Sequence, residues 1–458
     1  MPQDQIQDID EFVALIESWY REDFGGFATM YDAAIRHVRP VPEDAPEEVR
    51  HDWRGRTIND LCDFFREWER WRPGVSNGLD YIEKFSWISY ENDYGMVFLT
   101  SGPGCRMTAL FTELQGRYMD SEASLGLVDE WMRELGPRMD DYVVPAGGYR
   151  NFNEFFVRGV KRGKRPVDAP GDGSVVVAPA DCVVNMIVGE LTEETRIPVK
   201  TVTMNVRQLL DGSDYASRFV GGTAVSCFLL PKSYHRYHSP VAGRVVESRD
   251  DVGGVYYGMR NFPEMLNKGN IGYGYDYSMF EHFRRGYLVI ATGGNGNGLV
   301  GMVPVGLNSI ASVEFRQKFA KVTREDPVDV DKGEEIGCFK YGGSLNILLF
   351  EKGRFPALQL LQGQRIGNFE DPETSPAFFT GSWRTLPAPR VVTAPTAELG
   401  GAGDGPQPRR GAGGASEGRG DRPRAYQRSR RPRRGPPRHG APAPVAHRLA
   451  VIAGDGRP

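Results

Sequence analysis

From residue 174 onward the sequence carries short runs of β-branched and other apolar residues, each ended by Gly, Pro or Asp. Runs of about four to eight such residues with turn residues between them are typical of strands joined by short connections. The runs are SVVVAP, VVNMI, TVTMNV, AVSCFLL, GRVVES, YLVIAT, LVGMVPV and LNILLF. They predict an antiparallel, barrel- or sandwich-like domain with few helices.

The residues before Gly147 carry a different pattern, with apolar side chains at helical spacing. In the stretch TINDLCDFFREW, Leu61 and Phe65 share one helical face, and Thr57 is a candidate N-cap. The stretch LGLVDEWMREL is followed by Gly136 and a proline, a common helix stop. These patterns predict a helical N-terminal domain.

The segment from Pro387 to the last residue differs again in composition. It contains 14 Arg, no Lys and 5 acidic residues, a net charge of +9, whereas the remainder carries −13. A segment rich in Pro, Gly, Ala and Arg cannot bury enough apolar surface to offset its ordering entropy, so we expect disorder. An Arg-rich arm for nucleic acid or an acidic membrane surface is the alternative. Because the remainder is acidic, we expect no nucleic-acid partner.

Together these patterns predict an α+β protein. We expect a helical domain over residues 1–145, a β-rich and mostly antiparallel domain over 146–385, and a disordered tail over 386–458. No apolar run approaches the ~20 residues that would span a bilayer. The first residues, MPQDQIQDIDEF, lack the basic and apolar regions of a signal peptide. We therefore expect a cytoplasmic protein without a transmembrane segment.

Two histidines, His235 and His238, lie close together in PKSYHRYHSPVAG. Imidazole exchanges protons near neutral pH, which suits acid–base chemistry. Histidines at this spacing beside a proline can instead hydrogen-bond a turn, and that alternative stays open. A metal site needs further ligands, and no HExxH motif, Cys pair or carboxylate cluster supplies them at a recognisable spacing. We therefore expect no metal.

Gly342, Gly343 and Ser344 separate a charged turn from the apolar run LNILLF. Glycine weakens a strand, and serine adds little to a core. Either this is an ordinary bulge, or the backbone itself reacts at Gly343–Ser344. Asp181, in the turn of VVVAPADCVV, is either a turn residue or a carboxylate that orients a histidine.

Five motifs, taken in order over about residues 150–353, resemble the phosphatidylserine decarboxylase family. They are FNEFFVR, the APAD turn, YHRYHSPVAG, VPVGLNSI and KGEEIGCFKYGGS. Members of this family are pyruvoyl-dependent carboxy-lyases, made as proenzymes that form their own cofactor by cutting their chain. The resemblance therefore implies that residues 146–385 are a decarboxylase-like catalytic domain.

The resemblance also implies a role for each candidate residue. Ser344 attacks the carbonyl of Gly343, the chain is cut between the two, and Ser344 becomes the covalent pyruvoyl group. His238 is the activating base, Asp181 holds its tautomer, and His235 reprotonates the decarboxylated product. The pyruvoyl ketone forms a Schiff base with the substrate amine and accepts the electrons released with CO2. The two chains stay associated, and no metal is implied.

The substrate is indicated by departures from the phospholipid-processing pattern. The chain has GGSL in place of LGST, PADC in place of PADG and PVAG in place of PVDG. With the helical extension, these features resemble the soluble branch of the family, which includes tryptophan decarboxylases. They favour a soluble amino acid, with aromatic ones as candidates, over phosphatidylserine, which would require peripheral membrane contact. The tryptophans of the helical region either cover the active site or, as we favour, pack their own helices: Trp53, Trp68, Trp71 and Trp87.

Two non-catalytic alternatives stay open. SPVAGRV and KGEEIG are similar to the turns of biotinyl- and lipoyl-type barrels, which are binding modules. Such modules present a carrier lysine where this chain has Gly342, Gly343 and Ser344. A cleavage-dead relative that serves as a scaffold has no chemical reason to keep Asp181, His238 and Ser344 together, which argues against that alternative.

Overall fold

The structure of the chain is a computed structural model. It describes residues 6–43, 45–192, 205–257, 282–293, 298–307, 312–358 and 362. The predicted tail over 386–458 lies outside the described residues, as do residues 201–204 of the run TVTMNV.

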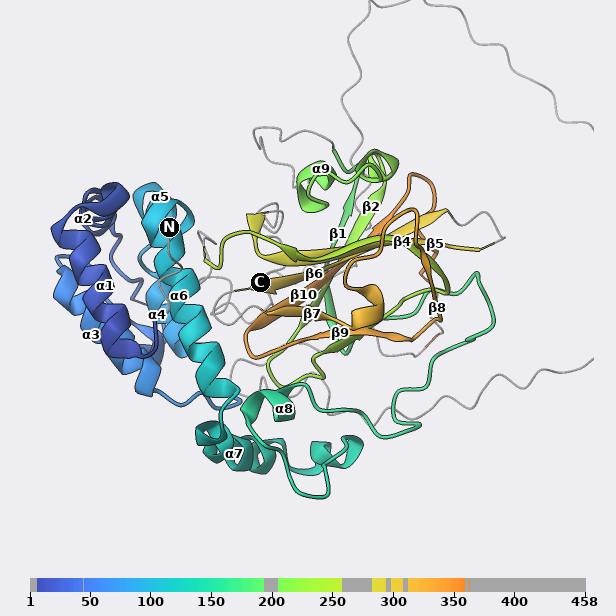
Figure 1. The fold of residues 1–458 in the computed structure, drawn as a ribbon, viewed down its shortest axis with the longest axis horizontal. Coiled ribbons are helices and arrows are strands. Elements are labelled where there is room, and N and C mark those ends of the chain that lie inside the picture. Colours follow the sequence, from blue (N-terminus) through green and yellow to red (C-terminus); the bar gives the residue numbers. More distant parts are fainter. Residues whose placement is uncertain are drawn as a thin grey trace, which may run out of the picture. The chain divides into compact units, whose positions relative to one another are not determined.

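The N-terminal region is helical, as predicted (Figure 1). Its α-helices are α1 (Ile9–Arg21), α2 (Phe27–His37), α3 (Ile58–Arg70), α4 (Asp80–Ser86), α5 (Asp93–Thr100), α6 (Gly102–Met119), α7 (Leu125–Leu135) and α8 (Phe152–Phe156). Short 3-10 turns lie between them at η1 (Phe24–Gly26), η2 (Glu47–Val49), η3 (Glu122–Ser124) and η4 (Gly136–Asp141).

Local sequence signals define two of these helices as expected. Thr57 accepts a hydrogen bond from the backbone of Asp60, and the Asp60 side chain bonds the backbone of Thr57 in return. This reciprocal capping box satisfies backbone donors that the first turn of α3 leaves unpaired. At the other end of the region, α7 stops at Gly136, whose φ of 51° favours glycine. Both predicted boundaries are confirmed.

The buried tryptophans of the helical region pack mainly against neighbouring helical side chains. Trp53 and Trp68 are 0% and 2% exposed. The ring of Trp53 lies 4.9 Å from that of Phe64, and the ring of Trp68 lies 4.9 Å from that of Phe111. Trp68 also contacts Tyr257, from the β-rich region, at 6.3 Å. The expectation that these tryptophans pack their own helices is therefore confirmed.

Within the described residues the strands form two sheets, and every strand pair is antiparallel. The seven-stranded sheet has the order β1 (Val183–Gly189), β2 (Thr223–Leu229), β10 (Gly343–Phe350), β6 (Leu299–Leu307), β5 (Arg285–Ala291), β4 (Gly243–Val252) and β8 (Val328–Val330). The three-stranded sheet has the order β3 (Arg236–His238), β9 (Glu335–Phe339) and β7 (Val313–Phe315). Short helices α9 (Val206–Leu209), η5 (Ala216–Phe219) and η7 (Gln317–Phe319) lie between strands.

The predicted strands match the observed ones with one clear exception among the runs that are fully described. Of the run TVTMNV only Asn205 and Val206 are described, and Val206 begins helix α9 instead of continuing a strand. The run SVVVAP at 174–179 is not a strand, because only scattered backbone bonds join it to its surroundings. Val177 donates to the carbonyl of Pro240 at 3.0 Å, and the carbonyl of Pro179 accepts from His238 at 2.7 Å. Strand propensity alone does not form a ladder where no partner strand runs alongside. The short strands β3, β7, β8 and β9 had no counterpart among the predicted runs.

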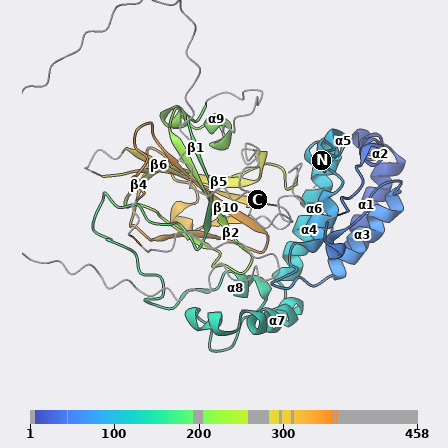
Figure 2. The ribbon, with the colours of Figure 1, turned by 180° about the vertical axis from the view of Figure 1, so that it is seen from behind.

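Strand β10 lies inside the larger sheet (Figure 2). Its two faces pack against different clusters of buried side chains. Successive side chains of a strand point to opposite faces. Leu345 and Ile347 belong to a core cluster that also contains helical residues, whereas Leu348 and Phe350 belong to the cluster shared with the three-stranded sheet. Ser344 therefore lies on the face that looks toward the three-stranded sheet.

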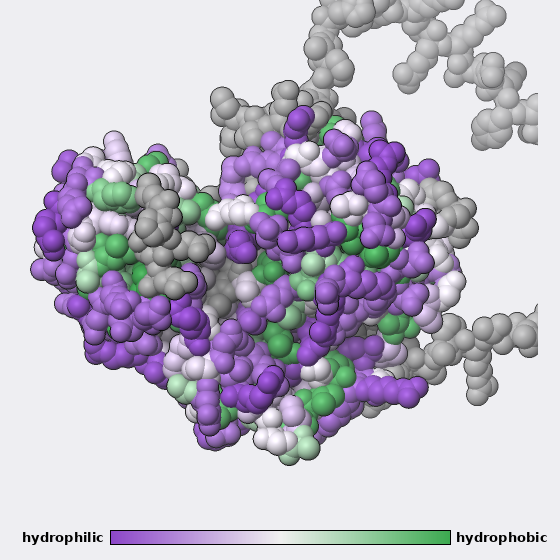
Figure 3. All heavy atoms as spheres, viewed as in Figure 1, coloured by the Kyte–Doolittle hydropathy of each residue, from purple (hydrophilic) through white to green (hydrophobic). Residues whose placement is uncertain are grey.

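The visible surface is mainly hydrophilic, with hydrophobic residues in small separate groups (Figure 3). Scattered apolar side chains of this kind are normal on globular proteins. Among the described residues, no helix combines the length and the apolar character that crossing a membrane requires.

Candidate active site

The Gly343–Ser344 peptide bond lies at the beginning of β10. Ser344 pairs with Leu229 of β2 and Gly306 of β6, and its side chain is fully buried. Gly342, just before the strand, has a φ of 145°, a conformation that residues with a Cβ rarely adopt. Glycine at this position therefore allows the backbone to enter the strand by a path closed to other residues.

His235 is the side chain that meets Ser344. It lies in the loop between β2 and β3, and its Nδ1 is 3.0 Å from Ser344 Oγ. Its other ring nitrogen, Nε2, is 3.0 Å from the carbonyl oxygen of Pro231. Because a carbonyl only accepts, Nε2 carries the proton and donates it to Pro231. The Nδ1 lone pair therefore faces the serine hydroxyl, which donates to it.

Burial keeps this histidine uncharged. His235 is fully buried, and this burial lowers its pKa to about 3. The side chain is therefore neutral near pH 7, as a proton acceptor must be.

The low pKa predicts that chain cutting depends little on pH if His235 is the base. Above about pH 4 protonation removes almost none of the neutral form, so the cutting rate should change less than about threefold between about pH 5 and pH 8. A base with an ordinary histidine pKa of about 6.5 would lose about thirtyfold over the same range. Freshly translated chain, shifted to each pH and followed on denaturing gels, measures this rate. A steep fall below about pH 6.5 would contradict the assignment.

The loop that carries His235 is fixed by residues of the FNEFFVR motif. The ring of Phe156 stacks on the imidazole, with centroids 4.0 Å apart. Arg158 is 1% exposed, and its guanidinium donates to the carbonyls of Lys232 and Ser233, each at 3.2 Å. These contacts hold the backbone just before His235 and leave the ring little freedom to turn away from Ser344.

The segment just before the candidate cut is fixed as well. The backbone N–H of Tyr341 donates to Asn153 Oδ1 at 3.0 Å, and the phenol donates to the carbonyl of Gly78 at 2.8 Å. Asn153 Nδ2 in turn donates to Asp120 at 3.1 Å. The approach to Gly343 is therefore anchored both to the motif helix α8 and to the helical region.

Replacing Asn153 with alanine should slow chain cutting. The change leaves the buried Tyr341 N–H without its acceptor, which should cost about 1–3 kcal/mol and loosen the segment before Gly343. Asn92→Ala is a matched control, because Asn92 is also buried but bonds Ala34 and Ile88 within the helical region. We expect both variants to lose thermal stability and only Asn153→Ala to be cut slowly at a permissive temperature. Equal cutting rates in both would contradict this anchoring.

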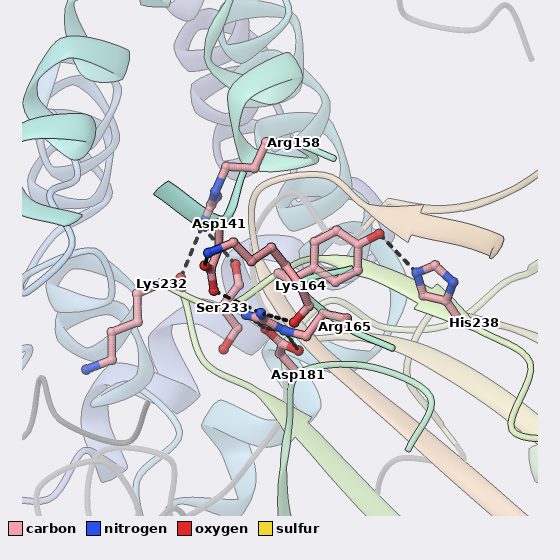
Figure 4. A network of polar contacts seen from close by, with 9 residues as sticks. Asp141, Arg158, Lys164, Arg165, Asp181, Lys232, Ser233 and His238 are labelled. Atoms are coloured by element: carbon pink, nitrogen blue, oxygen red, sulfur yellow. Dashed lines mark hydrogen bonds and ion pairs between the residues drawn. The ribbon is translucent and has the colours of Figure 1, made fainter. Parts of the chain in front are cut away.

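His238 makes different contacts from those of His235. Its Nδ1 is 2.9 Å from the carbonyl oxygen of Gly333, so Nδ1 donates, and its Nε2 accepts from the hydroxyl of Tyr234 at 2.9 Å. Burial lowers its pKa. Among the described residues, both ring nitrogens are thus occupied by partners other than Ser344. Figure 4 shows the contact of His238 with a tyrosine hydroxyl.

Asp181 lies in a bend before β1, as expected, and pairs with an arginine. Arg165 donates to both carboxylate oxygens, with distances of 2.8 to 3.1 Å, and also bonds Asp141 at 2.9 Å (Figure 4). The Asp181 side chain is only 10% exposed. The hydrogen bonds of the described residues include none between Asp181 and His238, although the charge of Asp181 is near enough to oppose the lowering of the His238 pKa by burial. The direct contact that the resemblance implied is therefore not found among these bonds.

Comparison with known proteins decides the family. The sequence profile described as Phosphatidylserine decarboxylase matches residues 152–368. The chain is 34% identical over 226 residues to the Phosphatidylserine decarboxylase proenzyme of Anoxybacillus flavithermus, covering 48% of this chain and 76% of that protein. The chain belongs to the phosphatidylserine decarboxylase family.

Other members of the phosphatidylserine decarboxylase family match a similar share of the chain. Phosphatidylserine decarboxylase proenzyme 3 of Schizosaccharomyces pombe is 32% identical over 238 residues, which cover 52% of this chain but only 22% of that protein. A proenzyme of Fusobacterium nucleatum is 28% identical over 239 residues, 52% of this chain and 72% of that protein. The family is one of carboxy-lyases, so the chain carries the fold of a decarboxylase proenzyme.

Within this family member, the structure brings together only part of the predicted site. Ser344 and His235 are in contact, and Gly343 lies beside them at the start of β10. Phe156, Arg158 and the anchored segment before the cut were not among the predicted site residues. No group of three or more potential metal-ligating side chains occurs in the described part of the chain.

Proposed function

We propose that the chain is a pyruvoyl-dependent amino acid decarboxylase, made as a proenzyme that cuts itself between Gly343 and Ser344. The observation that carries the proposal is the buried contact between Ser344 Oγ and the unprotonated Nδ1 of His235. A serine hydroxyl is a weak nucleophile unless a base accepts its proton. Here the base is already in hydrogen-bonding contact, next to a backbone path that glycine alone adopts readily.

In the proposed cut, His235 accepts the Ser344 proton and Oγ attacks the carbonyl carbon of Gly343. The peptide N–C bond breaks as an ester forms, and His235 passes the proton to the leaving nitrogen, which becomes the amino group of residue 344. Loss of the Cα proton and rupture of the Cβ–Oγ bond then release Gly343 as a carboxylate. This order assigns to His235 the basic role that the resemblance gave to His238.

The residues around position 344 are compatible with a pyruvoyl group formed from Ser344. When present, a pyruvoyl group supplies a carbonyl that accepts the electrons of a departing carboxylate. His235 loses its hydroxyl partner in the cut, so Nδ1 becomes free to hold or return a proton beside residue 344 during turnover. Phe156 covers one face of the ring and keeps bulk water from that side.

We propose that the two chains stay associated after the cut. The segment from Ser344 to Phe350 pairs along its length with β2 and β6, which both belong to the upstream chain. The proposed organisation keeps a helical domain over 1–145, a catalytic domain over 146–385 and a tail over 386–458. The family match over 152–368 supports the middle part of this division.

The proposed substrate is a soluble amino acid, with aromatic ones as the first to test. The departures GGSL, PADC and PVAG and the helical extension support it. Phosphatidylserine is the second candidate, supported by the names of the similar proenzymes. A free amino acid would be met in the cytoplasm, whereas phosphatidylserine requires contact with a membrane surface.

A denaturing intact-mass spectrum of the purified protein tests the cut. Two chains that split between Gly343 and Ser344, the smaller lighter by an ammonia than a serine start, are expected. A single uncut chain would favour a barrel-type binding module or a cleavage-dead scaffold instead. Release of CO2 from carboxyl-labelled amino acids and from phosphatidylserine in mixed micelles then separates the two substrate candidates.

A further inference from the structure

A fully buried asparagine stands in the apolar run of β10. Asn346 is 0% exposed, and among the residues that the structure describes neither its Oδ1 nor its Nδ2 has a hydrogen-bond partner. Burying an amide without partners is unfavourable, and native structures rarely tolerate it without a reason. An apolar residue of similar size would avoid this cost. The buried amide therefore suggests that a polar molecule binds to it at some stage.

Asn346 lies on the same face of β10 as the candidate cut. Two residues separate it from Ser344, and side chains two apart in a strand point the same way. Its neighbours across the sheet are Cys227 on β2 and Pro304 on β6. Cys227 is also buried, at 3% exposure. The amide of Asn346 therefore lies inside the protein, on the same side of the sheet as Ser344.

The chemistry proposed for the cut consumes one molecule of water. A Gly–Ser peptide plus one H2O balances a glycine carboxylic acid, a pyruvoyl group and one NH3. The water oxygen ends as the ketone oxygen on the Cα of residue 344, and the nitrogen leaves as ammonia. Since Ser344 is fully buried, that water must be held inside the protein.

A buried water needs two to four polar partners, or about three on average. The Asn346 amide offers an acceptor oxygen and a nitrogen with two N–H donors, and one water molecule can bond both atoms at once, whereas a carboxylate would satisfy only Nδ2. When Ser344 Oγ departs with Gly343, Nδ1 of His235 becomes a third partner that can accept the water proton.

We propose that the Asn346 amide holds the water molecule that replaces the nitrogen of residue 344, with His235 as the base that accepts its proton. The inference rests on the proposed function and concerns a step after the chain is cut. Asn346 thus acts during maturation of the protein. A change at Asn346 should slow the loss of ammonia and leave the cutting of the backbone unaffected.

The test compares Asn346→Leu with the parent chain. We expect Asn346→Leu to be cut between Gly343 and Ser344, but to release ammonia about a hundredfold more slowly. Borohydride added under native conditions converts a nitrogen-bearing terminus to alanyl and a ketone to lactyl, and peptide mass spectrometry distinguishes the two. The parent should yield lactyl and Asn346→Leu mainly alanyl. A lactyl terminus formed at the parental rate in Asn346→Leu would overturn the inference.

Ser226→Ala is the matched control. Ser226 is also buried with an unpartnered hydroxyl, but it lies opposite Ile347, whose side chain is on the other face of the sheet. It should mature like the parent, and an equal delay there would overturn the inference.

A stability measurement excludes a purely structural role for the amide. In the uncut Ser344→Ala background, Asn346→Leu should leave the melting temperature unchanged or raise it, because two unpaired polar atoms are removed. A large fall in melting temperature would make Asn346 a structural residue and overturn the inference. If the parent chain itself stays uncut, the proposed function fails, an outcome distinct from a cut Asn346→Leu variant that matures normally.

Discussion

Replacing Ser344 with alanine is expected to leave one uncut chain without decarboxylase activity. The change removes the oxygen that would attack Gly343, and no other hydroxyl in the described residues contacts Nδ1 of His235. Self-cutting should fall below detection, and with it every activity that depends on a group formed from residue 344. A denaturing gel and an intact-mass spectrum of freshly purified protein measure the outcome.

The same experiment needs a variant that perturbs the sheet without touching the site. Ser226→Ala removes a buried hydroxyl from β2, the neighbouring strand, on the opposite face. It should be cut at the parental rate. Normal cutting of Ser344→Ala would contradict the site assignment, whereas failure of both variants would point to a general loss of folding.

The second large effect on chain cutting is expected when His235 is replaced with alanine. The same replacement at His238 serves as the comparison. His235→Ala removes the acceptor 3.0 Å from Ser344 Oγ and should slow cutting by about 10²–10⁴-fold, the usual contribution of a general base. His238→Ala loses hydrogen bonds to Tyr234 and Gly333, so we expect a lower melting temperature but less than about tenfold slower cutting. Time courses of translated chain on denaturing gels give both rates.

Three results of this comparison have different meanings. Fast cutting of His235→Ala with a block in His238→Ala would restore the assignment made from the family resemblance. Cutting of both at the parental rate would return the two histidines to the role of turn residues. Loss of cutting in His235→Ala alone would support His235 as the base. The contact between His235 and Ser344 would then account for the result.

Much of the fold could be predicted from the sequence because its signals are local. Thr57 and Gly136 mark helix ends through contacts within a few residues, and the apolar runs of β2, β5, β6 and β10 match strands. The short strands β3 and β7 were not predicted, because a run of three residues carries too little pattern to be distinguished from a loop. The SVVVAP run failed for the opposite reason: its pattern is strong, but among the described residues only scattered backbone bonds, such as that from His238 to Pro179, join it to its surroundings.

The candidate site could be predicted only in part. The sequence drew attention to Ser344 through its unusual glycines, but the choice between His235 and His238 depends on a contact between residues 109 positions apart. No local pattern reports which of two histidines turns toward a distant strand. Asn346 was open to prediction, because it is a lone polar residue at an inward position of the run LNILLF.

The position of β10 between β2 and β6 has a consequence for how the protein survives stress. Before the cut, unfolding and refolding involve a single molecule, so recovery does not depend on protein concentration. If the chain is cut as proposed, an internal strand of the main sheet would belong to a separate polypeptide, and recovery would require two molecules to meet. The mature enzyme would then be protected by slow unfolding and could seldom reassemble once its chains had parted.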